Sequence, residues 1–263
     1  KTEGIELMDL ELNGKRALVL GASRGIGMAI AKSLAGEGAV VFAAARSVDK
    51  IESWAEGMSN VTPIKLDLSD IDAVDAVVDG LMAEGGVDIV VNNGGGPPPG
   101  AAQTTERTAW IANFEAMAAN LFHLTTRLLP AMKTRGWGRV ITVTSSGVEQ
   151  PIPNLALSNG IRSAVVGWSK TLAGEVAADG ITVNVVMPGR IHTQRVDELD
   201  AAAAKRTQKD VAEVAANSRA GIPVGRYGKP EEFADVVTFL ASARAAYVTG
   251  SRIRIDGGAI KSI

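Results

Sequence analysis

The residues near the start of the chain that are best suited to chemistry form a glycine-rich turn. Gly21-Ala-Ser-Arg-Gly25-Ile-Gly27 follows an apolar run, Arg16–Leu20, and precedes a helical stretch, Met28–Leu34. Glycine allows the backbone to turn sharply and to approach a pyrophosphate closely. The amino terminus of a helix adds free N–H groups and a partial positive charge. The pattern predicts a dinucleotide site that includes Gly21, Ser23, Arg24, Gly25, Ile26 and Gly27.

Two arginines near this turn indicate which dinucleotide is preferred. Arg46 ends the second apolar run, where an acid would bind the free ribose 2′-hydroxyl of NAD(H) and an arginine suits a 2′-phosphate. No Asp or Glu occurs between Val40 and Val48, and Arg24 can reach the same phosphate. The sequence therefore favours NADP(H) over NAD(H). The alternative is that Arg46 is a solvated residue after a strand.

The elements that position these residues alternate regularly. The first four of seven short apolar runs begin about 22–26 residues apart, the length of a strand, a crossover helix and two loops. This repetition predicts a doubly wound (Rossmann), mostly parallel seven-stranded α/β sheet with helices on both faces. We expect one domain over residues 12–263, preceded by an N-terminal extension, residues 1–11. The runs are Arg16–Leu20, Val40–Ala44, Thr62–Leu66, Asp88–Val91, Arg139–Val143, Thr182–Val186 and Arg252–Ile255.

Two further segments are interpreted as parts of a ligand site. Gly94–Gly100 reads Gly-Gly-Gly-Pro-Pro-Pro-Gly and follows directly on a strand, which predicts an active-site loop at the carboxyl edge of the sheet. The Ala-rich segment Gln194–Arg219 is helical in pattern and polar on one face. We expect residues 194–222 to form a lid or substrate loop.

Composition excludes several classes of function. Hydrophobic residues make up 46% and aromatic residues 4%, so the core must consist of Ala, Val, Ile and Leu, as in sheets buried on both faces. With 27 basic and 29 acidic residues the net charge is -2, which excludes nucleic acid as an electrostatic partner. The absence of cysteine excludes disulfides and thiolate chemistry, and two histidines are too few for a histidine-rich metal site.

The sequence also bears on where in the cell the protein is found. No apolar run reaches the ~18–20 residues that a membrane-spanning helix needs, so no membrane partner is expected. Lys1–Leu7 is polar and is not followed by a cleavable apolar core, as a signal peptide would require. We therefore expect the protein to be cytoplasmic.

Several motifs together resemble the short-chain dehydrogenase/reductase family, from about Leu12 to Gly258. Besides the glycine turn, they are Asp67, Asn92-Asn93-Gly94-Gly95, Pro188-Gly189-Arg-Ile-His-Thr193, Tyr247-Val-Thr-Gly250 and Asp256-Gly257-Gly258. The resemblance implies that Asp67 contacts the adenine. It places Asn93 and Gly94 in the cofactor site, and Pro188, Gly189 and Thr193 at its nicotinamide end. Bacterial 3-oxoacyl-carrier-protein reductases, which are homotetramers, are the most similar broad type.

The same resemblance implies a homodimer or homotetramer. Long paired helices are expected near Thr105–Arg135 and Leu157–Asp179. Gly, Ala and Val within Ser163–Gly174 permit close helix packing across a two-fold axis.

The catalytic stretch departs from the family pattern. The family has a Ser, a Tyr thirteen residues later and a Lys four residues after that; here Ser145, Ser158 and Arg162 occupy these positions. The family's helix-four Asn aligns with Met117, and Asn120 lies one turn further. No Tyr-x-x-x-Lys occurs in the chain. The resemblance thus assigns the catalytic positions to Ser145, Ser158 and Arg162, with Arg162 also binding the cofactor ribose.

These replacements alter the proton chemistry. A serine hydroxyl is a much weaker acid than a tyrosine, and arginine does not release its proton. Loss of a positioned general acid costs about 10²–10⁴ in rate unless another group replaces it. His192, Glu149 or a water held by Ser145 and Ser158 could supply the proton, although His192 and Glu149 could equally be solvated loop residues. His123, inside an apolar helix, is interpreted as a packed core residue.

The leading hypothesis is an NADP(H)-dependent oxidoreductase that interconverts a small-molecule carbonyl and alcohol with a non-standard proton donor. One alternative is an NADP(H)-binding pseudoenzyme, supported by the intact glycine turn beside an altered relay. Another is a non-redox enzyme on the same scaffold. Halohydrin dehalogenases resemble this family and carry arginine in place of the lysine, but they keep the tyrosine and lose the nucleotide glycines, the reverse of this sequence.

Overall fold

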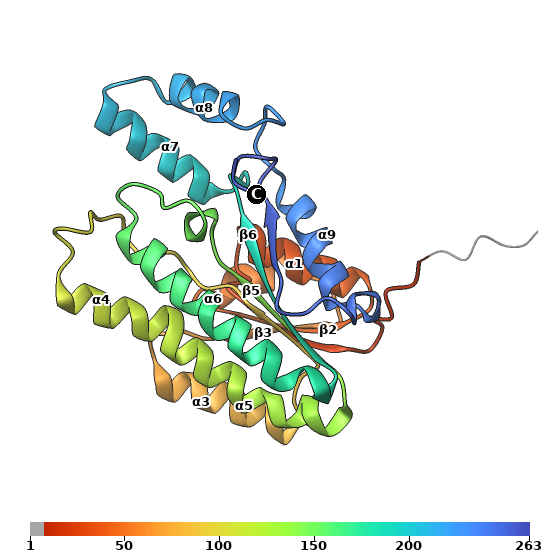
Figure 1. Ribbon diagram of the computed structural model, residues 1–263. Helices are drawn as coiled ribbons and strands as arrows, with labels where there is room; N and C mark the ends of the chain where they lie inside the picture. The colour runs from red at the N-terminus through yellow and green to blue at the C-terminus, as the bar shows by residue number, and fades with distance from the viewer. Residues whose placement is uncertain (1–7) are drawn as a thin grey trace, which may run out of the picture.

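The computed structural model describes residues 8–263 and contains a seven-stranded parallel sheet (Figure 1). The strand order is β3-β2-β1-β4-β5-β6-β7, so the chain starts at the centre, winds to one edge and then to the other. This is the predicted doubly wound Rossmann arrangement. The strands are β1 (Arg16–Leu20), β2 (Val40–Ala45), β3 (Val61–Lys65), β4 (Ile89–Asn92), β5 (Gly138–Val143), β6 (Ile181–Pro188) and β7 (Arg252–Ile255).

All seven predicted runs form strands, with ends that agree to within two residues. Strand β6 continues to Pro188 because that residue still pairs with Ile255 of β7. The parallel register brings the ends of β1, β4, β5 and β6 to one carboxyl edge, where ligands bind in open α/β sheets.

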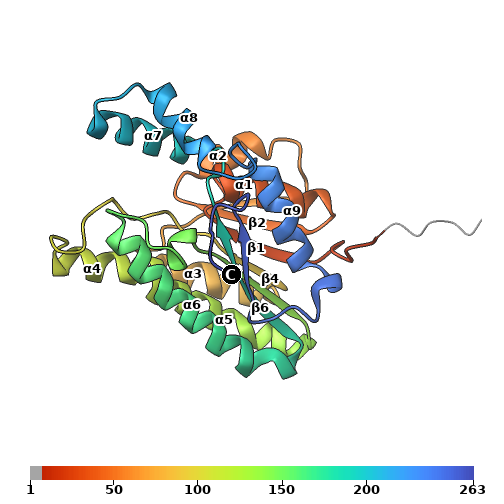
Figure 2. The same cartoon turned by 45° about the horizontal axis from the view of Figure 1, so that its top comes forward.

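Helices cover both faces of the sheet and bury two aliphatic cores (Figure 2). One face carries α1 (Gly25–Gly36), α2 (Val48–Trp54) and α9 (Pro230–Ala241). The other carries α3 (Ile71–Ala83), α5 (Asn120–Arg135) and α6 (Ala156–Val176). Central strands such as β1 and β4 are buried along almost their whole length, as the low aromatic content predicted.

The long helix expected near Thr105–Arg135 is interrupted. It consists of α4 (Arg107–Phe114), a π-helical turn η1 (Glu115–Ala119) and α5. Such turns insert an extra residue and are frequent at functional sites. Helix α6 runs beside α5, where Phe122 stacks on Trp168 with ring centroids 4.3 Å apart.

The interpretation of His123 as a packed core residue is wrong. Its side chain is 42% exposed, and its Nε2 atom lies 2.7 Å from the Asp75 carboxylate on α3. Arg127, one turn further along α5, pairs with the same carboxylate. Hydrogen bonds from His123 and Arg127 lower the pKa of Asp75. His123 therefore belongs to a polar seam between α3 and α5.

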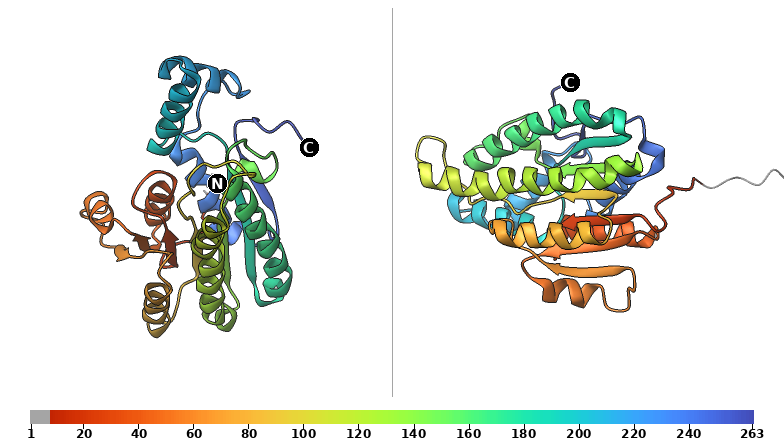
Figure 3. Two further views of the ribbon diagram at one scale, coloured as in Figure 1. Left: turned by 90° about the vertical axis from the view of Figure 1, so that its left-hand side faces the viewer. Right: turned by 90° about the horizontal axis from the view of Figure 1, so that it is seen from below.

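The segment 194–222, called the lid below, projects from the carboxyl edge as two helices (Figures 1 and 3). They are α7 (Gln194–Thr207) and α8 (Val211–Ala220). The predicted continuous helix is broken where Gln208 takes a left-handed conformation, φ 53°, and ends α7. Helix α8 contributes no buried residue, so α7 provides most of the contact with the body.

Residues 1–7 of the expected N-terminal extension lie outside the described residues. The rest of it packs onto the body: the Ala243 amide donates to the Leu10 carbonyl at 3.2 Å, and Arg244 Nε to the Asp9 carbonyl at 2.7 Å. Within residues 8–263, none of the helices combines the length and hydropathy required to cross a membrane.

Candidate cofactor and active site

The glycine-rich turn lies between β1 and α1, against the loop that follows β4. Gly21 and Gly25 have positive φ values of 65° and 58°. A Cβ on Gly21 would lie 2.3 Å from the Asn93 carbonyl oxygen, and one on Gly27 would lie 2.2 Å from the Gly21 carbonyl oxygen. Glycine is therefore required at both. Asn93 Nδ2 donates to the Leu20 carbonyl at 3.2 Å and holds the two loops together.

The amino terminus of α1 is suited to an anion. Arg24 is its N-cap residue, with an extended backbone and no side-chain capping bond, and the first turn carries no acid. Across this end lies Thr193, the N-cap residue of α7: a Cβ on Gly25 would lie 3.2 Å from Thr193 Cγ2. Thr193 therefore lies against the first turn of α1. These residues fit the pyrophosphate of a dinucleotide.

The other predicted cofactor residues surround the same edge. Pro188 ends β6, and a Cβ on Gly189 would lie 2.6 Å from Asp256 Cα, so β7 approaches too closely for any other residue. Gly94 follows β4 next to Leu68, and a Cβ there would lie 3.7 Å from Leu68 Cδ1. Ile26 packs against the core beneath α1, and Ser23 lies within the turn.

Arg46 and Asp67 follow β2 and β3, on the half of the sheet away from β6 and β7, and lie close to each other. Arg46 is exposed. The pKa of Asp67 is lowered because the Ser69 backbone N–H and hydroxyl donate to it, at 3.0 and 2.8 Å, and because the positive charge of Arg46 is close. A cation and a hydrogen-bonded carboxylate therefore occupy the place expected for an adenosine.

Arg24 is directed elsewhere. Its guanidinium donates to Gln194 Oε1 at 2.5 Å and lies 3.7 Å from Glu198 Oε1, both on α7. Sequence reasoning did not find this contact because about 170 residues separate the partners and no local pattern connects them.

Ser145 lies just after β5, and Ser158 and Arg162 lie on α6, where Arg162 bonds back to the last residue of β5. Ser145 Oγ accepts the Gly147 N–H at 3.1 Å. Arg162 lies one turn beyond the buried Ser158, and its Nη1 donates to the Val143 carbonyl at 2.9 Å. Burial lowers the pKa of Arg162 to about 10 and is the only cause of that shift. At neutral pH Arg162 is thus a partly buried cation that pairs with no carboxylate of the described residues.

Neither Met117, at the position of the family's helix-four Asn, nor Asn120, one turn further, is placed to relay a proton. Met117 lies in the π-helical turn and packs against the small apolar cluster of Leu157 and Ile161. Asn120 is buried and donates to the Leu68 carbonyl at 2.8 Å, which ties α5 to the loop after β3. Asn120 therefore acts in packing.

The two ionisable side chains considered as proton donors have other surroundings. Glu149 is 16% exposed and pairs with Arg254 at 3.3 Å and Arg252 at 3.8 Å on β7. His192 is 66% exposed and lies 3.6 Å from Asp197 in the first turn of α7. Glu149 is thus engaged by two arginines of β7, and His192 faces the lid.

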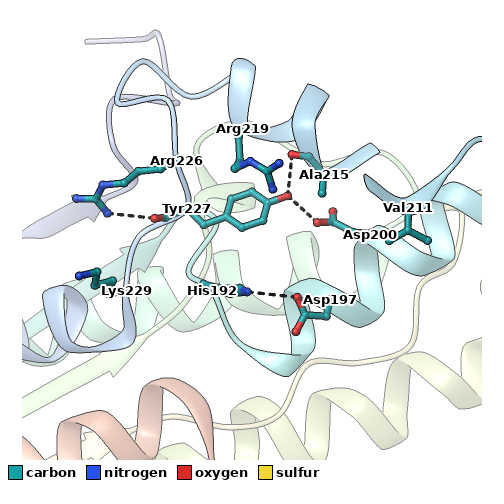
Figure 4. A pocket seen from close by; sticks show the side chains of 9 residues that line it. All are labelled: His192, Asp197, Asp200, Val211, Ala215, Arg219, Arg226, Tyr227 and Lys229. Atoms are coloured by element: carbon teal, nitrogen blue, oxygen red, sulfur yellow. Dashed lines mark hydrogen bonds and ion pairs between the residues drawn. The ribbon is translucent and has the colours of Figure 1, made fainter. Parts of the chain in front are cut away.

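A hydrogen-bonded cluster that sequence analysis missed anchors the lid (Figure 4). Asp200 of α7 is only 2% exposed, accepts the Tyr227 hydroxyl at 2.6 Å and pairs with Arg190 at 2.5 Å. Burial and the Asp200 carboxylate raise the pKa of Tyr227, the opposite of what a proton donor needs. Tyr227 lies beside His192 in a cleft of about 370 Å³ between the lid and the body.

Comparisons with known proteins agree with this architecture. Residues 21–259 match the family model described as enoyl-(acyl carrier protein) reductase. The chain is 36% identical over 257 residues to 3-oxoacyl-[acyl-carrier-protein] reductase FabG of Escherichia coli (strain K12), covering 95% of this chain and 98% of that protein.

Two solved structures superpose closely. One is L-sorbose reductase from Gluconobacter frateurii complexed with NADPH and L-sorbose: TM-score 0.91, 33% identity, 97% of this chain and 100% of that one. The other is YwfH, an NADPH-dependent reductase involved in bacilysin biosynthesis: TM-score 0.90, 30% identity, 95% of this chain and 100% of that one.

Proposed function

The chain belongs to the short-chain dehydrogenase/reductase family, and from that premise we propose that it is an NADP(H)-dependent oxidoreductase that interconverts a small-molecule carbonyl and alcohol without a tyrosine proton donor. The observation that carries the proposal is the glycine-rich turn, whose helix terminus has no side-chain cap, carries no acid in its first turn and lies against Thr193. When bound, the nicotinamide cofactor supplies the hydride. The α1 amides would bind its pyrophosphate, Arg46 its 2′-phosphate and Arg162 its ribose.

The reacting oxygen is held by neutral and cationic donors. The Ser145 and Ser158 hydroxyls donate hydrogen bonds to a carbonyl oxygen, and the Arg162 guanidinium stabilises the negative charge that grows on it. Donors aimed at a developing oxyanion contribute about 3–4 kcal/mol each in other enzymes. Water held by the two serines supplies the proton, because Glu149 is engaged by Arg252 and Arg254.

Cofactor choice is tested by titrating NADPH and NADH separately against the protein. NADPH binds more tightly, and Arg46→Asp removes the preference, since a charge-assisted contact of about 1.5–3 kcal/mol corresponds to roughly 10–150-fold in affinity. Lys50→Asp, an equal charge reversal on the exposed part of α2, serves as the control. Equal dissociation constants for both cofactors in the unmodified protein would refute the NADP(H) assignment.

An NADP(H)-binding pseudoenzyme is the second candidate, favoured by the serine and arginine at the family's Tyr and Lys positions. A panel of carbonyl substrates separates the two. It should include a 3-oxoacyl thioester and a keto sugar, the chemistries named for the relatives above. Cofactor oxidation with any of them supports the enzyme. Tight NADPH binding without turnover across the panel supports the pseudoenzyme.

A further inference from the structure

We propose that Gln194 and Glu198, in the first turns of α7, are specificity-determining residues that compete with the cofactor's 2′-phosphate for Arg24. The inference rests on the proposed preference for NADP(H). Gln194 and Glu198 are four residues apart, so they share one face of α7, and that face contacts Arg24 at 2.5 and 3.7 Å.

Arg24 has two alternative partners: Gln194 and Glu198 on α7, and the 2′-phosphate of a bound cofactor. Its backbone forms the N-cap of α1, while its side chain is 53% exposed. If the guanidinium turns to a 2′-phosphate, it leaves Gln194 and Glu198. If it stays on α7, the phosphate lacks this cation. In both cases Glu198 weakens binding of a 2′-phosphate, whereas a 2′-hydroxyl is unaffected.

Release of Arg24 does not detach the lid. Asp200, two residues beyond Glu198 on α7, remains buried against Arg190 and Tyr227. The first turn of α7 nevertheless lies near the loop after β4, since Arg195 Nη2 would lie 3.9 Å from a Cβ on Gly96. Arg24 therefore connects the identity of the nucleotide to the part of the lid that closes over it.

The probes are 2′,5′-ADP and 5′-AMP, which share the adenosine and differ in the 2′-phosphate. Glu198→Gln is expected to tighten 2′,5′-ADP by about 2–5-fold, the size of an exposed ion pair, and to leave 5′-AMP unchanged. Gln194→Ala should act in the same direction. Glu213→Gln is the matched control, because among residues 8–263 Glu213 pairs with Lys209 alone, at 2.5 Å within the lid. In an Arg24→Ala background the effect of Glu198→Gln should disappear.

Four results would overturn the inference. They are no change for Glu198→Gln, equal gains for both nucleotides, an equal gain for Glu213→Gln, or a gain that persists without Arg24. If 2′,5′-ADP binds the unmodified protein no better than 5′-AMP, the proposed cofactor preference fails and the inference with it. If the preference is present but Glu198→Gln has no effect, the inference alone fails.

Discussion

Replacing Arg162 with methionine should remove activity without destabilising the fold. Burial lowers the pKa of Arg162 from its ordinary value to about 10. A folded-state pKa below the unfolded one means that the charged form is disfavoured by folding. The penalty, roughly 3 kcal/mol, is complete below pH 10 and is relieved as the pH rises above 10. At pH 7 it opposes the hydrogen bond to the Val143 carbonyl, which contributes about 1.5–3 kcal/mol.

Arg162→Met removes both contributions and fills the space with a flexible apolar side chain. The free energy of unfolding should therefore stay unchanged or rise by up to about 2 kcal/mol, which raises Tm by about 0–6 °C for a chain of this size. Turnover should fall by about 10²–10³, as for loss of an oxyanion donor. Thermal unfolding followed by circular dichroism without cofactor, and turnover with NADPH, measure the two effects.

Arg139→Met is the matched control. Arg139 is also buried and its pKa is also lowered by burial, but its guanidinium donates to three carbonyls: those of Ser242, Gly138 and Gly180. Removing it leaves those acceptors without a partner and should cost more than about 2 kcal/mol. A fall in Tm of more than about 5 °C for Arg162→Met, comparable to that of Arg139→Met, would show that the Arg162 charge is compensated in the folded state.

Three further predictions concern the relay and the assembly. The double change Ser158→Tyr with Arg162→Lys should lower turnover, because Ser158 is buried and overpacking there costs about 1–3 kcal/mol; a clear gain in carbonyl reduction with unchanged cofactor affinity would contradict this. Glu149→Gln should change turnover less than about threefold, since its carboxylate is already paired; a loss of about 10²-fold would identify it as the proton donor. The exposed Ile111 and Phe114 on α4 should lie in a subunit interface, so that changing both to Asp lowers the solution mass; an unmodified protein that is monomeric at micromolar concentration would refute it.

Patterns carried by neighbouring residues predicted the sheet well. Each strand is a short apolar run between turn residues, and the repeat of strand, helix and strand leaves few topologies open. The π-helical turn Glu115–Ala119 was missed because a π-helix and an α-helix have the same residue preferences over five residues. His123 was misjudged because its partner, Asp75, lies 48 residues away on another helix.

In the candidate site, the glycine turn could be predicted from the sequence, but the partners of the charged side chains could not. Gly21 and Gly27 are required because neighbouring backbone carbonyls lie too close for a Cβ. Such glycines form a local sequence motif, and the motif predicted both of them. The partners of charged side chains have no such signature, because residues of the lid contact residues of the body that are far away in the sequence. Arg24 contacts α7 in the structure, while its predicted role at a 2′-phosphate stays a prediction. No sequence pattern indicated the hydrogen bond between Tyr227 and Asp200.

The serine and arginine replacements are chemically consistent with each other. A lysine beside a tyrosine lowers the pKa of that hydroxyl, a role that ends when the tyrosine is absent. We propose that such a site still needs a permanent positive charge close to the reacting oxygen, and that Arg162 supplies it. Among the described residues no carboxylate pairs with Arg162, and Glu149 is paired with the two arginines of β7. On this proposal the Arg162 charge stabilises negative charge on a ligand oxygen, and the proton comes from solvent.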